Sequence, residues 1–251
     1  MKSLTGRFAL ITGASKGLGK AMALALAEAG ATVALVSRDA TKLNEVAAEI
    51  RTRGGRAEVF AADVTEEAQL ARVREEFMAK CGGALHILIN NAGINIRKPV
   101  TDFTLEEWNR VIHTNLTSAF LLCRDFIPMM RGHGYGRVIN MTSMMAHVSL
   151  PGRTAYSASK TALLGFTRAL ALELAPDKIT VNGISPGPFA TEMNKPLMEN
   201  AELNAQFVSK IPLGCWGRVE DIGQLALYLC SENAGFITGT DILIDGGWTA
   251  Q

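Results

Sequence analysis

A tyrosine and a lysine at helical spacing, Tyr156 and Lys160, are the residues in this chain best suited to proton transfer. At positions i and i+4 of a predicted helix they lie on one face, one turn apart. A nearby ammonium favours a phenolate, so we expect Lys160 to lower the pKa of Tyr156 from about 10 toward the working pH. Such a pair suits proton exchange with a substrate hydroxyl or carbonyl. The same spacing is also typical of a lysine stem packed beside a half-buried tyrosine, so the surrounding residues must decide between the two.

Two further polar residues are expected near this pair. Ser143 directly follows a predicted strand, at the sheet edge where parallel α/β folds bind ligands. Asn115 lies inside a predicted helix, although asparagine is a poor helix former. A turn-capping hydroxyl and a solvated helix position are the structural alternatives for these two residues. Residues 90–93, Asn-Asn-Ala-Gly, end another predicted strand and alone indicate only a turn.

A glycine-rich turn follows the first predicted strand, with glycines at Gly13, Gly17 and Gly19. Glycine allows a tight turn and lets backbone N–H groups at a helix start approach a pyrophosphate. The spacing is G-x-x-x-G-x-G rather than the common G-x-G-x-x-G, and glycine is also a routine turn residue. The position after the first strand of a parallel sheet is what favours a phosphate-binding role.

Two nucleophile motifs overlap these segments, and the rest of the sequence supports neither. Residues 13–17 match the G-x-S-x-G turn of α/β-hydrolases, which requires a histidine late in the chain. The histidines are His86, His113, His133 and His147, so the C-terminal part of the chain holds none. Residues 157–160 match S-x-x-K, but the S-D-N and K-T-G elements of penicillin-binding enzymes are absent.

The elements that must position these residues alternate between strand and helix. The apolar runs predict strands at residues 8–12, 32–37, 58–62, 85–90, 136–142, 179–184 and 241–245, and helices at 18–28, 42–53, 66–80, 104–130, 154–173 and 219–230. Residues 104–107 form a capping box at the start of the fourth helix. Continuously apolar strands joined through helices are parallel and buried on both faces. We therefore expect one α/β domain over residues 1–251: a single-domain Rossmann-type doubly wound parallel sheet of about seven strands, with helices on both faces.

Composition excludes several function classes. The 251 residues hold 25 Lys+Arg and 24 Asp+Glu, and a net charge of +1 leaves no basic excess to neutralise nucleic-acid phosphates. The cysteines Cys81, Cys123, Cys215 and Cys230 lie far apart, so neither a disulfide framework nor a structural metal site is expected. The N-terminal apolar run is too short for a signal peptide, and nothing approaches a membrane span. We expect a cytoplasmic protein without a membrane or nucleic-acid partner.

Taken in order, these motifs resemble those of the short-chain dehydrogenase/reductase family. The matching pieces are Thr12-Gly-x-x-x-Gly-x-Gly19, Asp63, Asn90-Asn-Ala-Gly93, Asn115, Ser143, Tyr156-x-Ala-Ser-Lys160 and Pro186-Gly-x-x-x-Thr191. Each piece alone is weak, but all of them at ordinary spacings, over residues 5–248, are specific. The resemblance implies hydride transfer between a nicotinamide cofactor and a small carbonyl or alcohol substrate.

The resemblance also implies a role for each matching residue. Tyr156 would be the general acid in reduction and the base in oxidation, and Lys160 would tune it and hold the nicotinamide ribose. Ser143 would bind the substrate oxygen, and Asn115 would help hold a water that relays protons to Lys160. The implied cofactor contacts are Gly13, Ser15, Lys16, Gly17, Leu18, Gly19, Arg38, Asp63, Val64, Asn90, Ala92, Gly93, Tyr156, Lys160, Pro186, Gly187, Phe189 and Thr191. Asp63 would accept from the adenine amino group, with capping of the helix near Glu66 as its structural alternative.

The residues after the second strand predict which nicotinamide cofactor is used. An acidic residue there binds the ribose hydroxyls of NAD, whereas an arginine accommodates the 2′-phosphate of NADP. This chain has Ser37-Arg38-Asp39, and Lys16 would converge with Arg38 on the same phosphate. Asp39 is the complication, since a shift of one position would bring its carboxylate to the ribose. We predict NADP(H) as the preferred cofactor, with NAD(H) second.

The substrate is less well determined. Residues 187–215 form the expected substrate loop and carry Phe189, Met193, Asn194, Leu197 and Met198. Arg97 and Lys98 would attract an anionic substrate, although exposed cations on loops are commonly just solvated. The segments around these cations and around residues 215–218 resemble gluconate 5-dehydrogenase-like members acting on sugar acids or polyols, with 3-oxoacyl-acyl-carrier-protein reductase as the alternative.

A nucleotide-binding sensor or interaction module is the alternative from another class. Intact Asn115, Ser143, Tyr156 and Lys160 argue against it, because a pure binder needs no proton-transfer residues. Family members are commonly tetramers, so the resemblance implies a homotetramer. The long helices at residues 104–130 and 154–173 would pack against copies of themselves, or would merely cover the sheet.

Overall fold

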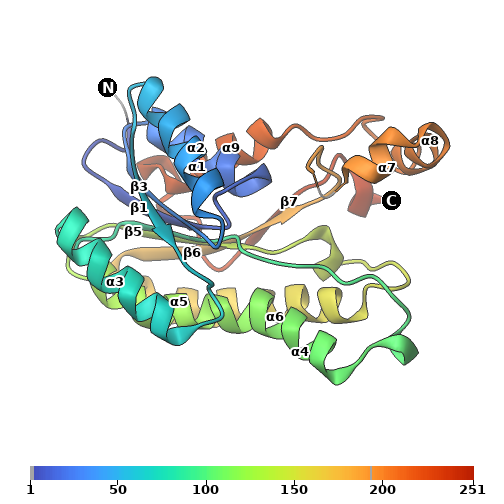
Figure 1. Cartoon of the computed structure of the whole chain (residues 1–251), viewed down its shortest axis with the longest axis horizontal. Coiled ribbons are helices and arrows are strands. Elements are labelled where there is room, and N and C mark those ends of the chain that lie inside the picture. Colours follow the sequence, from blue (N-terminus) through green and yellow to red (C-terminus); the bar gives the residue numbers. More distant parts are fainter. Residues whose placement is uncertain (1–2, 193) are drawn as a thin grey trace.

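The computed structural model describes residues 3–192 and 194–251, and within them the strands form one all-parallel sheet in the order β3-β2-β1-β4-β5-β6-β7 (Figure 1). The strands are β1 (Phe8–Thr12), β2 (Thr32–Ser37), β3 (Arg56–Ala61), β4 (Ile87–Asn90), β5 (Gly136–Met141), β6 (Ile179–Pro186) and β7 (Asp241–Ile244). The chain builds outward from β1 to β3, returns to the middle, and builds outward again from β4. The order therefore reverses between β1 and β4, the position where open parallel sheets bind ligands.

Helices cover both faces of the sheet. One face carries α1 (Gly17–Glu28), α2 (Ala40–Thr52) and α9 (Val219–Cys230), and the other carries α3 (Glu67–Cys81), α4 (Leu105–Ile112), α5 (Ser118–Phe126) and α6 (Thr154–Leu174) (Figure 1). Successive strand residues point to opposite faces. Leu10 accordingly packs in the core below α3 and α5, while Ile11 packs in the core below α1 and α9. The predicted doubly wound α/β fold is confirmed, because both faces of these strands are buried.

The boundaries differ from the predicted ones mainly where a polar residue begins or ends an element. β3 begins at Arg56 because its main chain pairs with Thr32 of β2, although its side chain is exposed. β6 extends to Pro186 because its end pairs with β7. β4 begins only at Ile87. Pairing with a neighbouring strand, which the local apolar pattern does not reveal, sets these ends.

The predicted long helix over residues 104–130 is divided into segments. Its capping box is confirmed, since Thr104 Oγ1 accepts from Glu107 N and the Glu107 carboxylate accepts from Thr104 N. The chain then runs through α4, a wider π-type turn (His113–Thr117), α5 and a final 3-10 turn (Ile127–Met130). Such π-type turns often mark functional positions. This one contains the buried Asn115, whose place within a helix the sequence alone left unexplained.

The expected substrate loop contains regular structure that the sequence analysis missed. It includes α7 (Lys195–Glu199) and α8 (Ala201–Val208), which lie at the end of the molecule toward which β7 points (Figure 1). Asn200 caps α8 through the backbone N–H of Leu203. The Phe207 ring stacks on Trp216 with centroids 5.0 Å apart and lies tilted against Trp248 at 5.1 Å. Both helices are too short to show a hydrophobic period, and the contacts of Phe207 with distant aromatic rings help to hold α8 in place.

Further features of the described residues concern membrane-spanning helices, clusters of metal ligands and free cysteine thiols. No helix among residues 3–192 and 194–251 is long and apolar enough to cross a membrane. Over the same residues, no three His, Cys, Asp or Glu side chains gather as a metal site would require. The thiols of Cys81, Cys123 and Cys230 are free and buried, and that of Cys215 is free and exposed.

A buried histidine generates a prediction about acid stability. The His86 ring accepts a hydrogen bond from the backbone N–H of Phe8 at 3.1 Å, and burial lowers its pKa to about 4. Because the folded-state pKa lies below the ordinary value of about 6.5, the unfolded chain binds the proton more readily. The contribution of neutral His86 to the free energy of unfolding is therefore present above pH 6.5 and lost as the pH falls toward 4.

We expect the wild type to lose about 2 to 3 kcal/mol more stability than His86→Asn between pH 7 and about pH 4.5, since asparagine keeps an acceptor for Phe8 but does not titrate. Urea denaturation at the two pH values measures this difference. Parallel pH profiles for the two proteins would contradict the assignment.

Candidate active site

The parallel sheet brings the predicted site residues to one edge. The glycine-rich turn follows β1, Asp63 follows β3, Gly93 follows β4, and Ser143 follows β5. All these strands end at the same edge because they are parallel. The first turns of α6 contribute Tyr156 and Lys160. The positions expected from the sequence are thus gathered into one region.

The glycine-rich turn is closed tightly onto the start of α1. Gly13 and Gly17 have φ angles of +64° and +54°, in the left-handed region that favours glycine. A Cβ on Gly19 would lie 2.3 Å from the Gly13 carbonyl oxygen, so no side chain fits there. In the described structure, no side chain caps the first N–H groups of α1. They are available to an anion, and the turn therefore fits a pyrophosphate.

Hydrogen bonds join this turn to the end of β4. Asn91 Nδ2 donates to the carbonyl oxygen of Thr12 at 2.8 Å, and Thr12 Oγ1 accepts from the backbone N–H groups of Asn91 and Ala92 at 3.0 and 3.1 Å. Asn90 instead turns into the sheet and donates to Asn140 Oδ1 at 2.8 Å. Asn91 belongs to the motif at residues 90–93 but was not among the predicted cofactor contacts. Its place beside Asn90 at a strand end is the signal that could have suggested a positioning role.

Asn115 holds the loop that follows Gly93. Its Oδ1 accepts from Ile94 N at 2.8 Å, and its Nδ2 donates to Ile94 O at 2.9 Å and to Ser159 Oγ at 3.0 Å. A Cβ on Gly93 would lie 3.2 Å from Asn115 Oδ1 and 3.6 Å from Lys160 Nζ. A side chain at residue 93 would therefore crowd the space beside Asn115 and Lys160. The proton-relay role of Asn115 stays a prediction.

The hydroxyls of Ser143 and Tyr156 lie beside each other. Ser143 begins a short 3-10 turn, and its Oγ accepts from Met145 N at 3.1 Å. Burial raises the pKa of Tyr156, while a hydrogen bond with Ser143 and the charges of Arg153 and Arg97 lower it by less. A carbonyl oxygen that reaches both hydroxyls would accept two hydrogen bonds, which favours charge developing on that oxygen.

Lys160 is buried, and its Nζ donates to the carbonyl oxygen of Met141 at 2.5 Å. Nζ lies 5.7 Å from the Tyr156 ring centroid, and burial lowers the pKa of Lys160 to about 8. The expected lowering of the Tyr156 pKa by Lys160 is not found in the structure. The net shift of Tyr156 is upward, because its burial outweighs the charges around it.

The two cations predicted to bind a phosphate each have a carboxylate partner. Lys16 Nζ lies 2.9 Å from Glu192, and Arg38 Nη1 lies 3.5 Å from Asp63. The Asp39 carboxylate accepts from Lys42 N at 3.0 Å and caps α2. Asp63 also accepts from the N–H and hydroxyl of Thr65, which precedes Glu66, the N-cap of α3, so Asp63 does not itself cap that helix.

The segment after β6 lies against the glycine-rich turn. Thr191 is within van der Waals reach of a Cβ built on Gly17, and Gly187 N donates to Ile244 O at 2.9 Å. The Phe189 side chain is buried in the core against Gly217, and its cofactor contact stays a prediction. Met193 lies outside the described residues. Among the other predicted contacts, Ser15 and Leu18 are half-buried in the turn and the start of α1, and Val64 is in the core.

The cations expected near the substrate separate into two environments. Lys98 Nζ binds Glu107 at 2.5 Å and lies over the Phe103 ring. Arg97 is exposed, and its positive charge slightly opposes the rise in the pKa of Tyr156. Arg153, which the sequence analysis did not single out, also acts on Tyr156. A cationic border thus lies beside the proposed proton donor.

Comparison with known proteins extends over nearly the whole chain. A family model described as Enoyl-(Acyl carrier protein) reductase matches residues 13–249. The 3-oxoacyl-acyl-carrier-protein reductase of Aquifex aeolicus is 36% identical over 97% of this chain and 98% of its own length. The gluconate 5-dehydrogenase of Gluconobacter oxydans is 33% identical over 99% and 97%.

A solved structure extends this likeness to three dimensions. The gluconate 5-dehydrogenase of Burkholderia cenocepacia, in complex with NADP and tartrate, is 34% identical and covers 100% of this chain and 98% of its own, with a TM-score of 0.94. The order of motifs, the site geometry and these matches agree. The chain belongs to the short-chain dehydrogenase/reductase family of oxidoreductases.

Proposed function

We propose that this enzyme interconverts a ketone and a secondary alcohol on a sugar acid or polyol, using NADP(H). The observation that carries the proposal is the pair Arg97 and Arg153, on two loops that are joined by the Lys98 N–Gly152 O hydrogen bond. Both charges act on Tyr156, which suits a substrate that carries a carboxylate. The gluconate 5-dehydrogenases among its relatives support the same substrate class.

The side chains of this site supply binding and proton transfer. The nicotinamide, when bound, supplies or accepts the hydride. In reduction the substrate carbonyl oxygen accepts hydrogen bonds from Ser143 and Tyr156, and Tyr156 gives its proton to that oxygen. Lys160, with a pKa of about 8, exchanges protons near neutral pH. The same residues acting in reverse accept the proton in oxidation.

The proposed preference for NADP(H) rests on Arg38. The Asp39 carboxylate is occupied as a helix cap, which argues against its binding the ribose hydroxyls. The ion pairs of Arg38 with Asp63 and of Lys16 with Glu192 are exposed, and such pairs contribute at most about 1 kcal/mol. A phosphate can therefore compete for both cations at little cost.

The reaction generates a test of Tyr156. We expect Tyr156→Phe to lower kcat on 5-keto-gluconate with NADPH by about 10²- to 10⁴-fold, because the proton donor is lost. NADPH binding, followed by fluorescence titration, should change little. Tyr228→Phe, at an exposed tyrosine on α9, is the matched control and should behave like the wild type.

Assays of the wild type with NADPH and a wider set of carbonyl and alcohol substrates separate the alternative functions. Preferential turnover of an acetoacetyl thioester over any keto acid would favour a 3-oxoacyl-acyl-carrier-protein reductase. A wild type that binds NADPH but turns over no carbonyl or alcohol would favour a nucleotide-binding sensor.

The cofactor preference generates a second test. We expect Arg38→Gln to lower kcat/KM for NADPH by about 10-fold or more while leaving that for NADH nearly unchanged, because one charge-assisted contact to the 2′-phosphate is removed. Arg53→Gln, at the far end of α2, is the control and should alter neither value. A wild type that prefers NADH, or an unchanged ratio in Arg38→Gln, contradicts the assignment.

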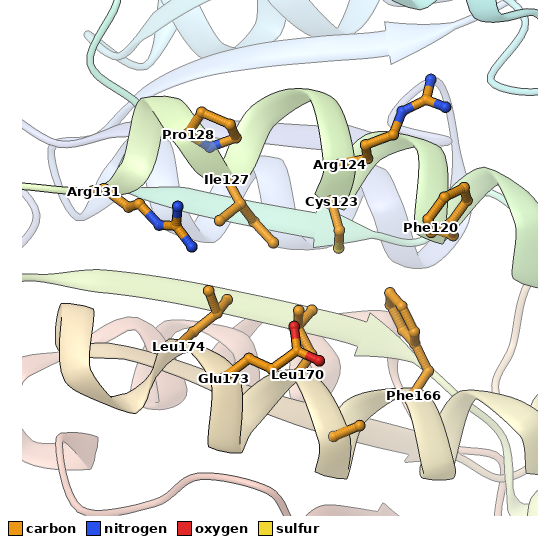
Figure 2. Close-up of a pocket in the computed structure, with 11 residues that line it drawn as sticks. Phe120, Cys123, Arg124, Ile127, Pro128, Arg131, Phe166, Leu170, Glu173 and Leu174 are labelled. Atoms are coloured by element: carbon orange, nitrogen blue, oxygen red, sulfur yellow. The ribbon is translucent and has the colours of Figure 1, made fainter.

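We also propose a homotetramer whose subunits meet along α5 and α6. A groove of about 420 Å³ runs between these helices. Phe120, Ile127, Phe166 and Leu170 lie along it, with Arg124 and Arg131 on one side and Glu173 on the other (Figure 2). The apolar side chains of the groove suit a two-fold contact with a second copy, in which the same surface of each subunit is covered by the other.

This surface generates a third test. Phe120 is 47% exposed, and we expect Phe120→Glu to reduce the assembled mass measured by light scattering, since the interface would bury an unpaired carboxylate. Leu105→Glu, on the 74% exposed Leu105 of α4, should leave the assembly intact. A monomeric wild type would refute the proposed assembly.

A cytoplasmic location is the last part of this proposal. Free thiols, as in Cys81 and Cys215, fit a reducing compartment.

A further inference from the structure

We propose that Arg153 is a specificity-determining residue that binds the carboxylate of the substrate, with Arg97 as its neighbour. The inference rests on the proposed function and identifies the side chain that recognises the substrate carboxylate. It concerns the guanidinium of Arg153, directly before α6, three residues ahead of Tyr156. Arg153 is the N-cap residue of α6, so it lies within one turn of Tyr156 along the chain.

The Arg153 guanidinium is partly buried and lacks a counterion. Its Nη1 is buried, and across residues 3–192 and 194–251 no acceptor forms a hydrogen bond with it and no carboxylate forms an ion pair with Arg153. A buried unpaired donor is unfavourable, and a buried charge more so. By contrast, Arg168 lies exposed on the same helix. Arg153 therefore has an unused capacity to bind an anion.

A backbone contact brings the second arginine to the same place. Lys98 N donates to Gly152 O at 3.2 Å, which joins the loop after β4 to the loop before α6. Arg97 and Arg153 each lie one residue from this contact. Burial lowers the pKa of Arg153, and the charge of Arg97 lowers it further, so the two guanidinium groups repel each other. An anion between them would replace this repulsion with two attractions.

The position relative to Tyr156 indicates where on the substrate the anion must be. Arg153 precedes Tyr156 by three residues at the start of α6, and its charge and that of Arg97 both act on the Tyr156 hydroxyl. A planar guanidinium matches a carboxylate through two parallel hydrogen bonds. The substrate expected from this arrangement is a keto acid or hydroxy acid whose carboxylate lies a few bonds from the reacting carbon.

The kinetic test compares an acid with a neutral ketone of similar size. We expect Arg153→Gln to raise KM for 5-keto-gluconate about 10- to 100-fold, the range that corresponds to losing one charge-assisted bidentate contact. The kcat/KM for fructose, a neutral six-carbon ketose, should change less than about 3-fold. Arg153→Lys keeps the charge but not the planar fork, and should fall between. Arg168→Gln is the matched control and should leave both substrates unaffected.

Two results would overturn the proposal. An equal loss on the acid and on the neutral ketose would assign Arg153 an effect on Tyr156 or on folding instead. An unchanged KM for the acid would remove Arg153 from recognition altogether.

A binding measurement separates this inference from the proposed function. Tartrate, a small hydroxy dicarboxylate, is titrated calorimetrically into the NADPH-bound wild type and into Arg153→Gln. If keto-gluconate is not turned over but tartrate binding is weakened about 10-fold or more by Arg153→Gln, the proposed substrate fails and carboxylate binding by Arg153 stands. If tartrate binds both proteins equally or neither protein, the role of Arg153 is refuted.

Discussion

Hydrogen bonds between Thr12 and Asn91 tie the end of β1 to the end of β4, at the point where the strand order reverses. One side of this junction leads into the glycine-rich turn and α1, and the other into the loop that ends beside Lys160. A displaced junction would move the proposed phosphate-binding N–H groups and the proton-transfer residues relative to each other. Since hydride transfer requires a fixed distance between cofactor and substrate, the remaining geometry depends on this contact.

Burial sets the electrostatics of the proton-transfer residues. It raises the pKa of Tyr156 and lowers that of Lys160, so in each residue burial shifts the equilibrium toward the neutral form. The charges of Arg97 and Arg153 oppose this effect at Tyr156. An anionic substrate that neutralises these arginines would weaken that opposition and keep the hydroxyl protonated. Under the proposed function, substrate binding and proton donation in reduction would then be linked through the same two charges.

The sequence predicted the fold and most of the site because those signals are local. Continuous apolar strands indicate a parallel sheet, and the glycine spacing at Gly13, Gly17 and Gly19 indicates a tight turn at a helix start. The capping box at Thr104 is likewise formed by residues three apart. What the pattern missed has non-local causes: α8 depends on Phe207 packing against Trp248, and the π-type turn surrounds the contact of Asn115 with Ile94.

The sequence by itself determined which chemical groups this protein has and in what order the sheet presents them. It could not determine the environment of those groups. Only the tertiary structure decided that the pKa of Tyr156 is raised and that Arg153 has a buried donor without a partner among the described residues. The physical reason is that burial and charge act through space. The loops that carry Arg97 and Arg153 are far apart in sequence, and only packing of the chain joins them through the Lys98 N–Gly152 O hydrogen bond.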